Sequence, residues 1–558
     1  MRKSICFKGF SVVKNVLSIL VISFALLFTG CGSDTDKESI KITLSRSSIT
    51  LDIGEEYQLS AAVSGAENSE ILWSSKDSLV AEISAGKVKG VSAGTTVITV
   101  ETADGKGEAE CSITVTSNSI TQNEVFNNSD LNYVFDLKAI PEVTIEISEA
   151  EWNKLLTNFD ANPKNEDEVS ATFIFNKNGT EEKLENIGFR LRGNTSRFRP
   201  EGSNGQLHNS VNPEWHRAHF ALKFDKFVKD SKFHNLKGIN MKYFKDDSNY
   251  CREVYSYDLF KRFSVWTAPF SSYAKFSIKI AEDSKKAYFG IYQMIEPVDG
   301  EFIKKRFPTD NGGNLWKCLY QQNGPADLKS GDVVSKMGLE DPAINYFPTY
   351  DLKTNKKSLA TAKTSFESFI NNLNSKSDSE FEQWAGANID IDLFLRATAV
   401  NVTVGMWDDY WINGNNYYLY FDSSNKMYFI PYDYDNTLGT SMIIDSASQN
   451  PLYWGDTNNR PLVRRILAIE ANKNRYKEYL KSLVSKDREL FYYQYSMARI
   501  LSWQNGVKDF VANDTWDGMA VVDSPAFWSN NTTYRLNDDD EKKNFFRVKE
   551  AAILNSCK

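Results

Sequence analysis

After residue 38 the chain begins with short runs in which apolar and polar residues alternate. The runs IKITLS, ITLDIG, YQLSAAV, VAEIS and TTVITVET have a period of two, and Gly, Asp and Ser punctuate them. Such alternation, with turn residues between the runs, is typical of half-buried strands in an all-β sandwich. We therefore expect an Ig-like β-sandwich domain over residues 38–117, followed by an Asn- and Ser-rich linker over residues 118–135.

Residues 136–558 mix two periodicities. The strand-like run VTIEI is followed by Ser148 and, three residues later, by Glu151, a capping-box signal for a helix over residues 149–157. More alternating runs follow (ATFIFN, IGFRLRG, HFALKFDKF), and the later sequence has apolar residues at helical spacing. We expect an α+β domain. The other predicted elements are a hairpin at residues 274–280 and 287–295 and helices at residues 252–263, at residues 451–493 and near the end of the chain.

The first 30 residues have the composition of an export signal. A basic start precedes an apolar run at residues 16–28, and Thr-Gly-Cys31 ends it. This order is typical of a signal peptide, and small residues before a cysteine resemble the lipobox of bacterial lipoproteins. A transmembrane anchor is the weaker alternative because the apolar run is short for a bilayer span. We expect lipidation at Cys31 and a lipid anchor in the bacterial outer membrane, with an acidic sorting-like stretch favouring the cell surface.

The composition narrows the classes of partner. With 558 residues and 41% hydrophobic residues, the chain is expected to form two or more well-packed domains. The formal net charge of −8 predicts no basic surface, so nucleic acid is not expected as a partner. The six cysteines show no CxxC spacing and there are four histidines, so neither a zinc site nor a disulfide scaffold is indicated.

Oxygen-bearing side chains stand at both ends of a predicted hairpin made of the runs YYLYF and KMYFIPY. Asp408, Asp409 and Asn416 precede it, and Asp433 and Asp435 follow it. Because the return turn brings both ends together, these oxygens can bind a divalent cation and supply one base, as phosphoryl transfer requires. The alternatives are a calcium site or ordinary turn aspartates, and no EF-hand pattern is present.

A second group of candidates lies upstream, at the end of the run IGFRLRG. It consists of Arg190, Arg192, Gly193, Asn194 and Ser196. Backbone amides freed by a Gly-Asn turn, together with arginine and hydroxyl groups, can hold phosphate oxygens. The alternative is an ordinary hairpin end. The pattern GxxxxGK[ST] is absent, which excludes a P-loop NTPase.

Three further candidates follow from their place in the pattern. Lys223 stands among apolar neighbours in ALKFD, where it is either a solvated lysine or one that reaches nucleotide phosphates from a strand. Glu253 lies near the start of a predicted helix, where a lysine of the preceding strand can meet it. Glu296 ends the strand AYFGIYQMIE, in an acidic connector that resembles a hinge between two lobes.

Two parts of the chain resemble known families. The segment GKVKGVSAGTTVITV, with Trp73 upstream, resembles bacterial Ig-like group 2 domains and implies a spacer or weak adhesion module. The ordered set RLRGNTS, ALKFDKF, YFGIYQMIEPVD, GNLWK, NNYYLY and IPYDYD resembles the spore-coat-H (CotH) kinase family, with a core at about residues 143–500. This second resemblance implies a two-lobed atypical protein-kinase-like fold, ATP with Mg²⁺ or Mn²⁺, and phosphorylation of Ser or Thr in a protein substrate.

The resemblance also implies a role for each candidate. Lys223 would hold the nucleotide phosphates, and the RGNTS turn would replace the glycine-rich loop. Asp408 matches the aspartate of a DSY-like pattern and would accept the substrate hydroxyl proton, but the adjacent Asp409 leaves the base ambiguous by one residue. The family pattern PWDxD is PYDYD here, and its usual His-Asn is Asn-Asn. The metal ligands would be Asn416, Asp433 and Asp435.

We therefore expect an exported lipoprotein in which an Ig-like spacer carries an atypical protein kinase. Two rival interpretations stay open. In one, the kinase-like domain is a catalytically silent binding module. In the other, the protein is a surface adhesin that interacts with carbohydrate, which the 12 tryptophans and 26 tyrosines favour. The sequence contains no sign of the protein substrate, of the oligomeric state or of a source of ATP outside the cytoplasm.

Overall fold

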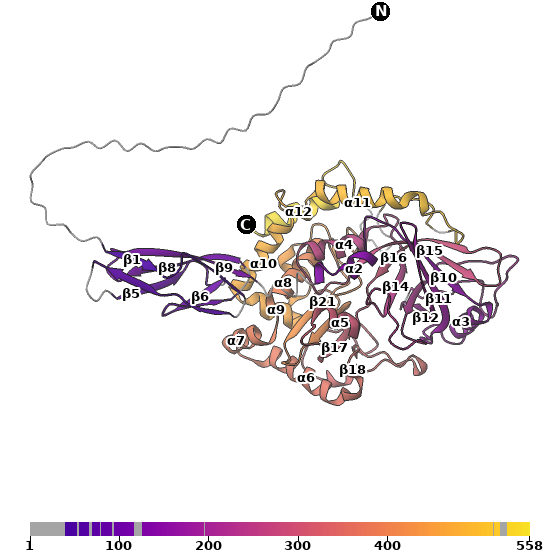
Figure 1. Cartoon of the computed structure of the whole chain (residues 1–558), viewed down its shortest axis with the longest axis horizontal. Helices are drawn as coiled ribbons and strands as arrows, with labels where there is room; N and C mark the ends of the chain where they lie inside the picture. The colour runs from indigo at the N-terminus through magenta and orange to yellow at the C-terminus, as the bar shows by residue number, and fades with distance from the viewer. Residues whose placement is uncertain are drawn as a thin grey trace, which may run out of the picture. The chain divides into compact units, whose positions relative to one another are not determined.

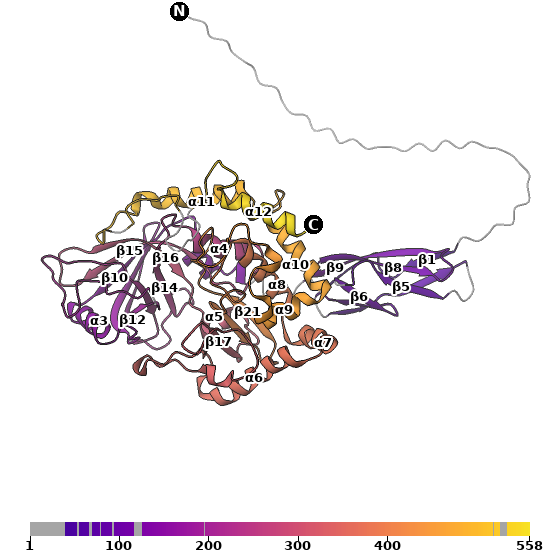
Figure 2. The ribbon, with the colours of Figure 1, turned by 180° about the vertical axis from the view of Figure 1, so that it is seen from behind.

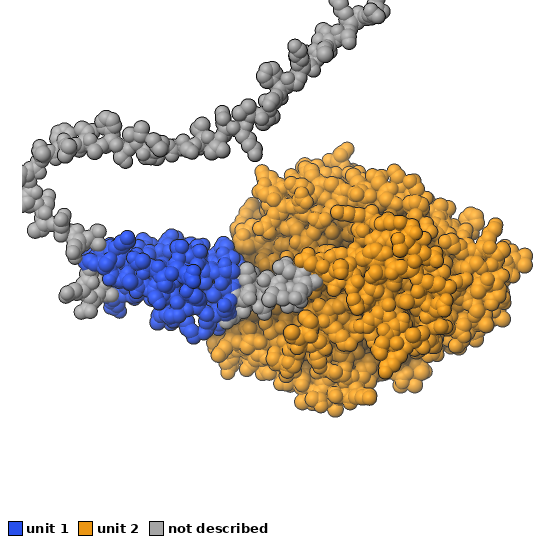
Figure 3. Space-filling model, viewed as in Figure 1, with its two compact units in different colours: residues 1–115 blue, residues 116–558 orange. Residues whose placement is uncertain are grey.

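The computed structural model describes residues 40–52, 55–65, 70–78, 80–91, 94–116, 125–194, 196–516, 518–524 and 533–558. The chain divides into two compact units, residues 1–115 and 116–558 (Figure 1, Figure 3). The expected export signal and Cys31 lie outside the described residues and stay predictions. Within the ranges above, no helix has the length and apolar character that a bilayer crossing requires.

Unit 1 is built from strands around one small core. The strands are β1 (Lys41–Leu44), β2 (Ser48–Asp52), β3 (Glu56–Gln58), β4 (Ala61–Ser64), β5 (Ile71–Ser75), β6 (Ala81–Ser84), β7 (Lys87–Gly90), β8 (Gly94–Thr102) and β9 (Glu108–Thr116). They form the sheets β1-β4, β2-β9-β8-β5 and β3-β7-β6. Alternate residues of β9, namely Cys111, Ile113 and Val115, are buried, as the period-two pattern predicts. The all-β prediction for this unit is confirmed.

Unit 2 contains a closed β-barrel in its N-terminal part. Its strands are β10 (Glu142–Ile147), β11 (Val169–Lys177), β12 (Thr180–Arg192), β13 (His219–Lys223), β14 (Gly238–Tyr243), β15 (Ser271–Ile280) and β16 (Ala287–Ile295). They follow one another around the barrel in the order β10-β11-β12-β13-β14-β16-β15, and β10 pairs in parallel with β15 to close it. Helix α3 (Glu149–Ala161) follows β10, and the serine half of the predicted capping box forms: the hydroxyl of Ser148 accepts a hydrogen bond from the backbone N–H of Glu151. The Glu151 carboxylate instead accepts a hydrogen bond from the backbone N–H of Ser170.

Aromatic residues fill the barrel because each strand sends alternate side chains inward. Phe173 and Phe175 of β11 lie there with Phe189 of β12, Phe220 of β13 and Phe276 of β15. The stacked rings of Phe189 and Phe220 have centroids 4.9 Å apart. Since the inside is apolar throughout, polar residues of these strands must point outward.

The rest of unit 2 surrounds a second, larger core. A five-stranded sheet has the order β18 (Met337–Gly338), β19 (Tyr350–Leu352), β17 (Asn314–Cys318), β20 (Tyr417–Phe421) and β21 (Met427–Pro431). The helices are α2 (Ser129–Val134), α4 (Arg252–Arg262), α5 (Gly300–Arg306), α6 (Leu359–Ser375), α7 (Asp378–Asn388), α8 (Ile391–Thr403), α9 (Pro461–Ala468), α10 (Glu470–Leu483), α11 (Tyr493–Val507) and α12 (Phe545–Ser556). Both ribbon views show α11 and α12 along one edge of unit 2, reaching towards the barrel (Figure 1, Figure 2). The expected α+β content is present.

The predicted hairpins form, and the helical region near the C-terminus contains two helices. In β20–β21, Tyr417 pairs with Pro431, so the loop before β20 and the segment after β21 meet at one sheet edge. The region 451–493, predicted to be helical, contains the helices α9 and α10, which are separated by Ile469 in an extended conformation. The alternation of apolar and basic residues continues through Ile469, so the sequence pattern did not indicate where the first helix ends.

Candidate functional site

The acidic residues after β21 meet a lysine of the barrel. The Nζ atom of Lys242 lies 2.8 Å from Glu253 Oε2, 2.5 Å from Asp433 Oδ1 and 2.9 Å from Asp435 Oδ2. The Lys242 and Glu253 side chains are 8% and 3% exposed, whereas those of Asp433 and Asp435 are 37% and 35% exposed. The lysine–glutamate pair is therefore the buried floor of the site, and the two aspartates face its opening.

Local structure explains why these groups converge. Lys242 points away from the apolar barrel interior because its neighbours in β14 point into it. Helix α4 begins shortly afterwards, where the carboxylate of Asp247 accepts a hydrogen bond of 2.9 Å from the backbone N–H of Arg252. Glu253 thus lies in the first turn of α4, facing Lys242. Its Oε1 also accepts the backbone N–H of Tyr434 at 3.0 Å, which ties α4 to the segment after β21.

Burial opposes every charge in this group, and the partners decide which charges persist. For Lys242 the three carboxylates outweigh burial and raise its pKa well above the usual range. Burial also works against the charge of Asp433, but Lys242 and two further cations outweigh it and lower its pKa. For Glu253 and Asp435, burial prevails over Lys242 and raises the pKa, and the charge of Asp433 adds to that effect. Lys242 and Asp433 are the most firmly charged members.

Asp408 lies in the turn before β20 and is held by three asparagine side chains. Its Oδ1 accepts hydrogen bonds from Asn413 Nδ2 at 2.7 Å and Asn415 Nδ2 at 3.0 Å, and its Oδ2 accepts one from Asn416 Nδ2 at 3.0 Å. Burial raises the pKa of Asp408, the amides of Asn413 and Asn415 oppose this, and the nearby charge of Asp433 reinforces it. Asp408 is therefore an oriented carboxylate with a raised pKa, which suits a proton acceptor.

Asp409 has different surroundings. It is 5% exposed, and its carboxylate accepts hydrogen bonds from the backbone N–H of Ile412 at 2.7 Å and from the amide of Asn401 in α8. Burial raises its pKa to about 7. It also lines a cavity of about 20 Å³, which has room for a single water molecule. Its hydrogen bonds fasten the turn to α8, so Asp408 and Asp409 point to different partners.

Asn416, Asp433 and Asp435 offer oxygen atoms to a cation. Asn416 has a φ of 55° and gives its Nδ2 to Asp408, which leaves its amide oxygen for another partner. Asp433 and Asp435 each bind Lys242 through one carboxylate oxygen, and the second oxygens make no hydrogen bond within the described ranges. This hard-oxygen set fits Mg²⁺ or Mn²⁺, which take their remaining ligands from phosphate and water. Among the described residues no group of three or more His, Cys, Asp or Glu could hold a metal ion by itself.

Two more cations border Asp433. Arg192, at the end of β12, donates a hydrogen bond from Nη2 to the Tyr432 hydroxyl at 3.1 Å. Lys317, on β17, holds its Nζ over the ring of the same tyrosine, 5.2 Å from the centroid. His219 on β13 is the register partner of Arg192 on the neighbouring strand β12. Burial together with the neighbouring cations lowers the pKa of His219 well below the usual range. His219 is therefore neutral between cations.

Two of the predicted phosphate-binding residues lie away from this group. Lys223 is exposed at the end of β13 and pairs with Gly238, four residues before Lys242 on β14, which is ~13 Å along the strand. Arg190 forms an ion pair with Glu166 at 3.0 Å. The structure therefore places Lys242 where Lys223 was expected, and of the two arginines only Arg192 faces the acids.

The turn after β12 and the expected hinge residue also have other partners. Gly193 has a φ of 113°, and its carbonyl accepts a hydrogen bond of 3.0 Å from Arg197, so this turn is tied to its own loop. Asn194 is exposed and Ser196 half-buried in the same turn. Glu296 is 1% exposed, and both of its carboxylate oxygens bind Arg306, at 3.0 and 2.6 Å. Glu296 is thus a buried ion-pair partner, and its carboxylate is not directed at Lys242.

The candidates drawn from the sequence omit several residues that the structure brings into the site: Lys242, Asn413, Asn415, Lys317 and Tyr432. A signal for Lys242 was present, since it lies near the end of the alternating run GINMKY, which is the strand that precedes the helix of Glu253. Lys317 ends the run GNLWK, one of the motifs that resemble the CotH family, but its role could not be read from that run because its neighbours across the sheet are distant in sequence.

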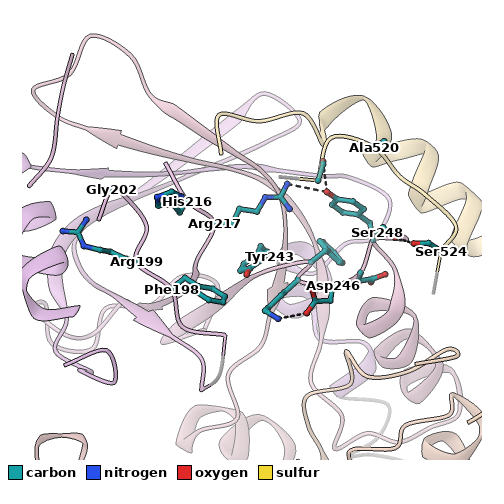
Figure 4. A pocket seen from close by; sticks show the side chains of 15 residues that line it. Phe198, Arg199, Gly202, His216, Arg217, Tyr243, Asp246, Ser248, Ala520 and Ser524 are labelled. Atoms are coloured by element: carbon teal, nitrogen blue, oxygen red, sulfur yellow. Dashed lines mark hydrogen bonds and ion pairs between the residues drawn. The ribbon is translucent and has the colours of Figure 1, made fainter. Parts of the chain in front are cut away.

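A cavity of about 810 Å³ lies next to the end of β14, and none of the predicted site residues lines it (Figure 4). Its walls come from the loop after β12, the segment after β14 and residues 518–524. Within it, the ammonium of Lys245 lies 2.5 Å from the carboxylate of Asp246, and the Tyr250 hydroxyl donates a hydrogen bond of 2.9 Å to the Gly518 carbonyl. The residues that resemble catalytic machinery are those around Lys242, not those of this cavity.

Comparison with known protein families shows to which family this chain belongs. The family model described as "CotH kinase protein" matches residues 189–534, more than half of the chain. The chain belongs to this family. The CotH match includes Lys242, Glu253 and the whole β20–β21 hairpin with its acids. A second model, "Bacterial Ig-like domain (group 2)", matches residues 40–113 and so identifies the β-structure of unit 1.

Curated relatives of this CotH protein are distant. "Invasin CotH7" of Rhizopus delemar is 23% identical over 415 residues, which cover 72% of this chain and 61% of the relative. "Spore coat protein homolog 1" of the same organism is 24% identical over 468 residues, which cover 77% of this chain and 67% of that relative. The chain thus spans about 61% of the length of the first of these relatives. A protocadherin gamma B7 structure is 12% identical to this chain, over 34% of this chain and 46% of the protocadherin chain. The TM-score of 0.15 is too low to indicate a shared fold.

Proposed function

We propose that this CotH protein is an exported atypical protein kinase that transfers the γ-phosphoryl group of ATP to Ser or Thr of surface or secreted proteins. One observation carries the proposal: a buried lysine–glutamate pair, Lys242 and Glu253, meets Asp433 and Asp435 beside an oriented Asp408. Phosphoryl transfer needs charge neutralisation and alignment more than covalent chemistry, and this set of groups can supply both. The barrel and the helical part would be the two lobes of a kinase-like fold.

Each residue has a role in this proposal. Bound ATP with Mg²⁺ or Mn²⁺ would supply the phosphoryl group and part of the charge neutralisation. Asn416, Asp433 and Asp435 would hold the metal ion through the oxygens that their contacts with Asp408 and Lys242 leave unused. Lys242 would orient phosphate oxygens, with Glu253 keeping its ammonium in position. Asp408 would accept the proton of the substrate hydroxyl, since three amides fix its carboxylate and its pKa is raised.

A transfer assay with radiolabelled ATP and either metal tests this function on the full chain. We expect Asp408→Asn and Asp433→Asn to lower transfer by at least ~10²-fold, since one removes the base and the other a metal ligand. Asp487→Asn is the matched control, because this aspartate is exposed and its side chain makes no contact with the site. Equal transfer by all four proteins would refute the assignment, and thermal melts exclude misfolding.

Export and lipid anchoring belong to the same proposal. A lipid on Cys31 would hold the protein at the bacterial outer membrane, and the Ig-like unit would act as a spacer. A kinase acting on surface or secreted proteins must itself reach that side of the membrane. Protease treatment of intact cells tests the orientation: complete protection of the protein would contradict surface exposure.

A second candidate function is binding without catalysis. The name of one relative, "Invasin CotH7", favours a role in surface interaction for part of this family. The observation that separates the two functions is turnover. Metal-dependent ATP binding without any phosphoryl transfer would favour the binding module, whereas transfer that depends on Asp408 would exclude it.

A further inference from the structure

Arg192, Tyr432 and Lys317 form a small group at the mouth of the site, and we name it the Tyr432 clamp. The hydroxyl of Tyr432 accepts the hydrogen bond of Arg192 at 3.1 Å, and its ring lies 5.2 Å from Lys317 Nζ. The two cations come from the barrel strand β12 and from the sheet strand β17, respectively. One tyrosine, directly before the expected metal ligand Asp433, therefore contacts a cation from each part of unit 2.

The charge balance of these cations differs from that of their neighbours. Lys242 is bound to three carboxylates, and Lys353 lies 2.5 Å from Glu340 and 2.6 Å from Asp351. Within the described ranges, Arg192 and Lys317 form no ion pair; their contacts are the hydroxyl and the ring of Tyr432. Both are half-buried. Because no direct ion pair holds either cation, both can still bind the oxygens of an added anion.

The position of the clamp indicates which anion fits. Tyr432 directly precedes the expected metal ligand Asp433, so the two cations that contact this tyrosine lie on the side of the site where the metal would be held. A polyphosphate that shares a divalent cation with Asp433 and Asp435 presents oxygens to its surroundings on that side. The guanidinium of Arg192 suits two oxygens of one phosphate, and the ammonium of Lys317 acts as a point charge.

Tyrosine at position 432 matters to this arrangement. The corresponding place in the pattern PWDxD holds tryptophan, whose indole N–H donates and cannot accept. Arginine only donates, so a tryptophan here could not accept the hydrogen bond that Tyr432 accepts from Arg192. The ring face, in contrast, would attract Lys317 in either case. The hydroxyl is thus the feature that brings Arg192 into the clamp of this chain.

We propose that Arg192, Tyr432 and Lys317 bind the terminal phosphates of a metal–polyphosphate, with Tyr432 holding both cations in place. This inference rests on the proposed function for the identity of the ligand, a nucleoside triphosphate. It adds Lys317 as a binding residue and Tyr432 as a positioning residue. Both would act on the affinity for the phosphate chain and not on recognition of the nucleoside.

Calorimetry on the full chain tests the clamp with three probes: ATP with Mg²⁺, tripolyphosphate with Mg²⁺, and adenosine. We expect Lys317→Met to weaken binding of both phosphate probes at least ~10-fold, and Lys317→Arg to retain most of it. Adenosine binding should not change. Lys357→Met is the matched control, because Lys357 is exposed and makes no ion pair within the described residues. Tyr432→Phe should weaken phosphate binding less than Lys317→Met does, because only the Arg192 contact is lost.

The outcomes separate the clamp from the proposed function. Tripolyphosphate binding by Lys317→Met at wild-type strength would overturn the clamp, and so would a wild-type protein that does not bind tripolyphosphate. Lys317-dependent polyphosphate binding without any phosphoryl transfer would support the clamp and refute the kinase. Transfer by Lys317→Met with unchanged kcat/KM would support the kinase and refute the clamp. An unchanged thermal melt for Lys317→Met and Lys317→Arg shows that both variants fold.

Discussion

Replacement of Lys242 tests the centre of the site most directly. Lys242→Met keeps the length and apolar stem of the side chain but removes the cation that three carboxylates share. Glu253 is 3% exposed, so the variant leaves a buried carboxylate without its counter-ion. Breaking a buried ion pair in this way costs about 3–5 kcal/mol of the free energy of unfolding. We expect a loss of that size at pH 7, together with loss of phosphoryl transfer.

The loss should depend on pH in a defined direction. Asp433 has a lowered pKa, so its stabilisation is present above its ordinary pKa of 3.8 and disappears as the pH falls through the folded value. Lys242 has a raised pKa, so its contribution is present below its ordinary value of 10.5 and disappears only when the pH rises through the folded value. The difference between wild type and Lys242→Met should therefore be largest around neutral pH and shrink in acid, where the carboxylates become protonated.

Denaturant unfolding at several pH values measures this effect, and Lys223→Met is the control. Lys223 is an exposed lysine in a neighbouring strand of the same barrel, so its loss should change the free energy of unfolding by less than ~0.5 kcal/mol. Adding Glu253→Gln to Lys242→Met should restore part of the lost stability, because it removes the uncompensated charge. The reasoning is refuted if Lys223→Met and Lys242→Met have equal effects, or if the loss in Lys242→Met grows as the pH falls.

Three further changes have definite expected outcomes. Asp409→Asn should lower the free energy of unfolding by about 1–3 kcal/mol, since its amide cannot accept from both Asn401 and the turn, and chemical denaturation measures this. Lys549 is buried without a hydrogen bond in the described chain, and burial lowers its pKa to about 7, so wild-type stability should rise from pH 7 to pH 10. Lys549→Met should be more stable at pH 7 and lack that rise, and thermal melts across this range that show no difference would contradict it. Gly518→Ala should loosen residues 518–524 from the segment before α4, because its Cβ would clash with the Tyr250 hydroxyl at a φ of +62°; hydrogen exchange of residues 518–524 reports the change.

The elements that local pattern specifies agree with the sequence-based predictions. Strand β9 alternates because one of its faces packs in a small core, and α3 begins at Ser148 because a hydroxyl there caps the first turn. These signals lie within a few residues of one another, so a local interaction determines them. The break at Ile469 between α9 and α10 was not predicted, since the apolar pattern runs through it and tertiary packing sets the turn.

The acids of the site were identifiable for a related reason. Asp433 and Asp408 flank a hairpin, and a hairpin brings its own ends together whatever the rest of the fold does. The structure shows what surrounds each of them. Asp408 is held by three asparagines, whereas Asp409 binds Asn401 of α8, a contact that depends on how α8 packs beneath the turn. Two adjacent aspartates cannot be distinguished without that packing.

The choice between Lys223 and Lys242 shows most clearly what could not be predicted from the sequence alone. Lys223 ends β13, Lys242 is the last residue but one of β14, and both point out of an apolar barrel. The sequence by itself determined that a lysine on a strand, a glutamate at a helix start and acids around a hairpin belong to this chain. Only the tertiary structure decided that Lys242 meets the carboxylates, because the register between β13 and β14 places Lys223 beside Gly238 instead. Strand register and the docking of α4 are long-range properties, which depend on packing of the whole barrel and not on any local run of residues.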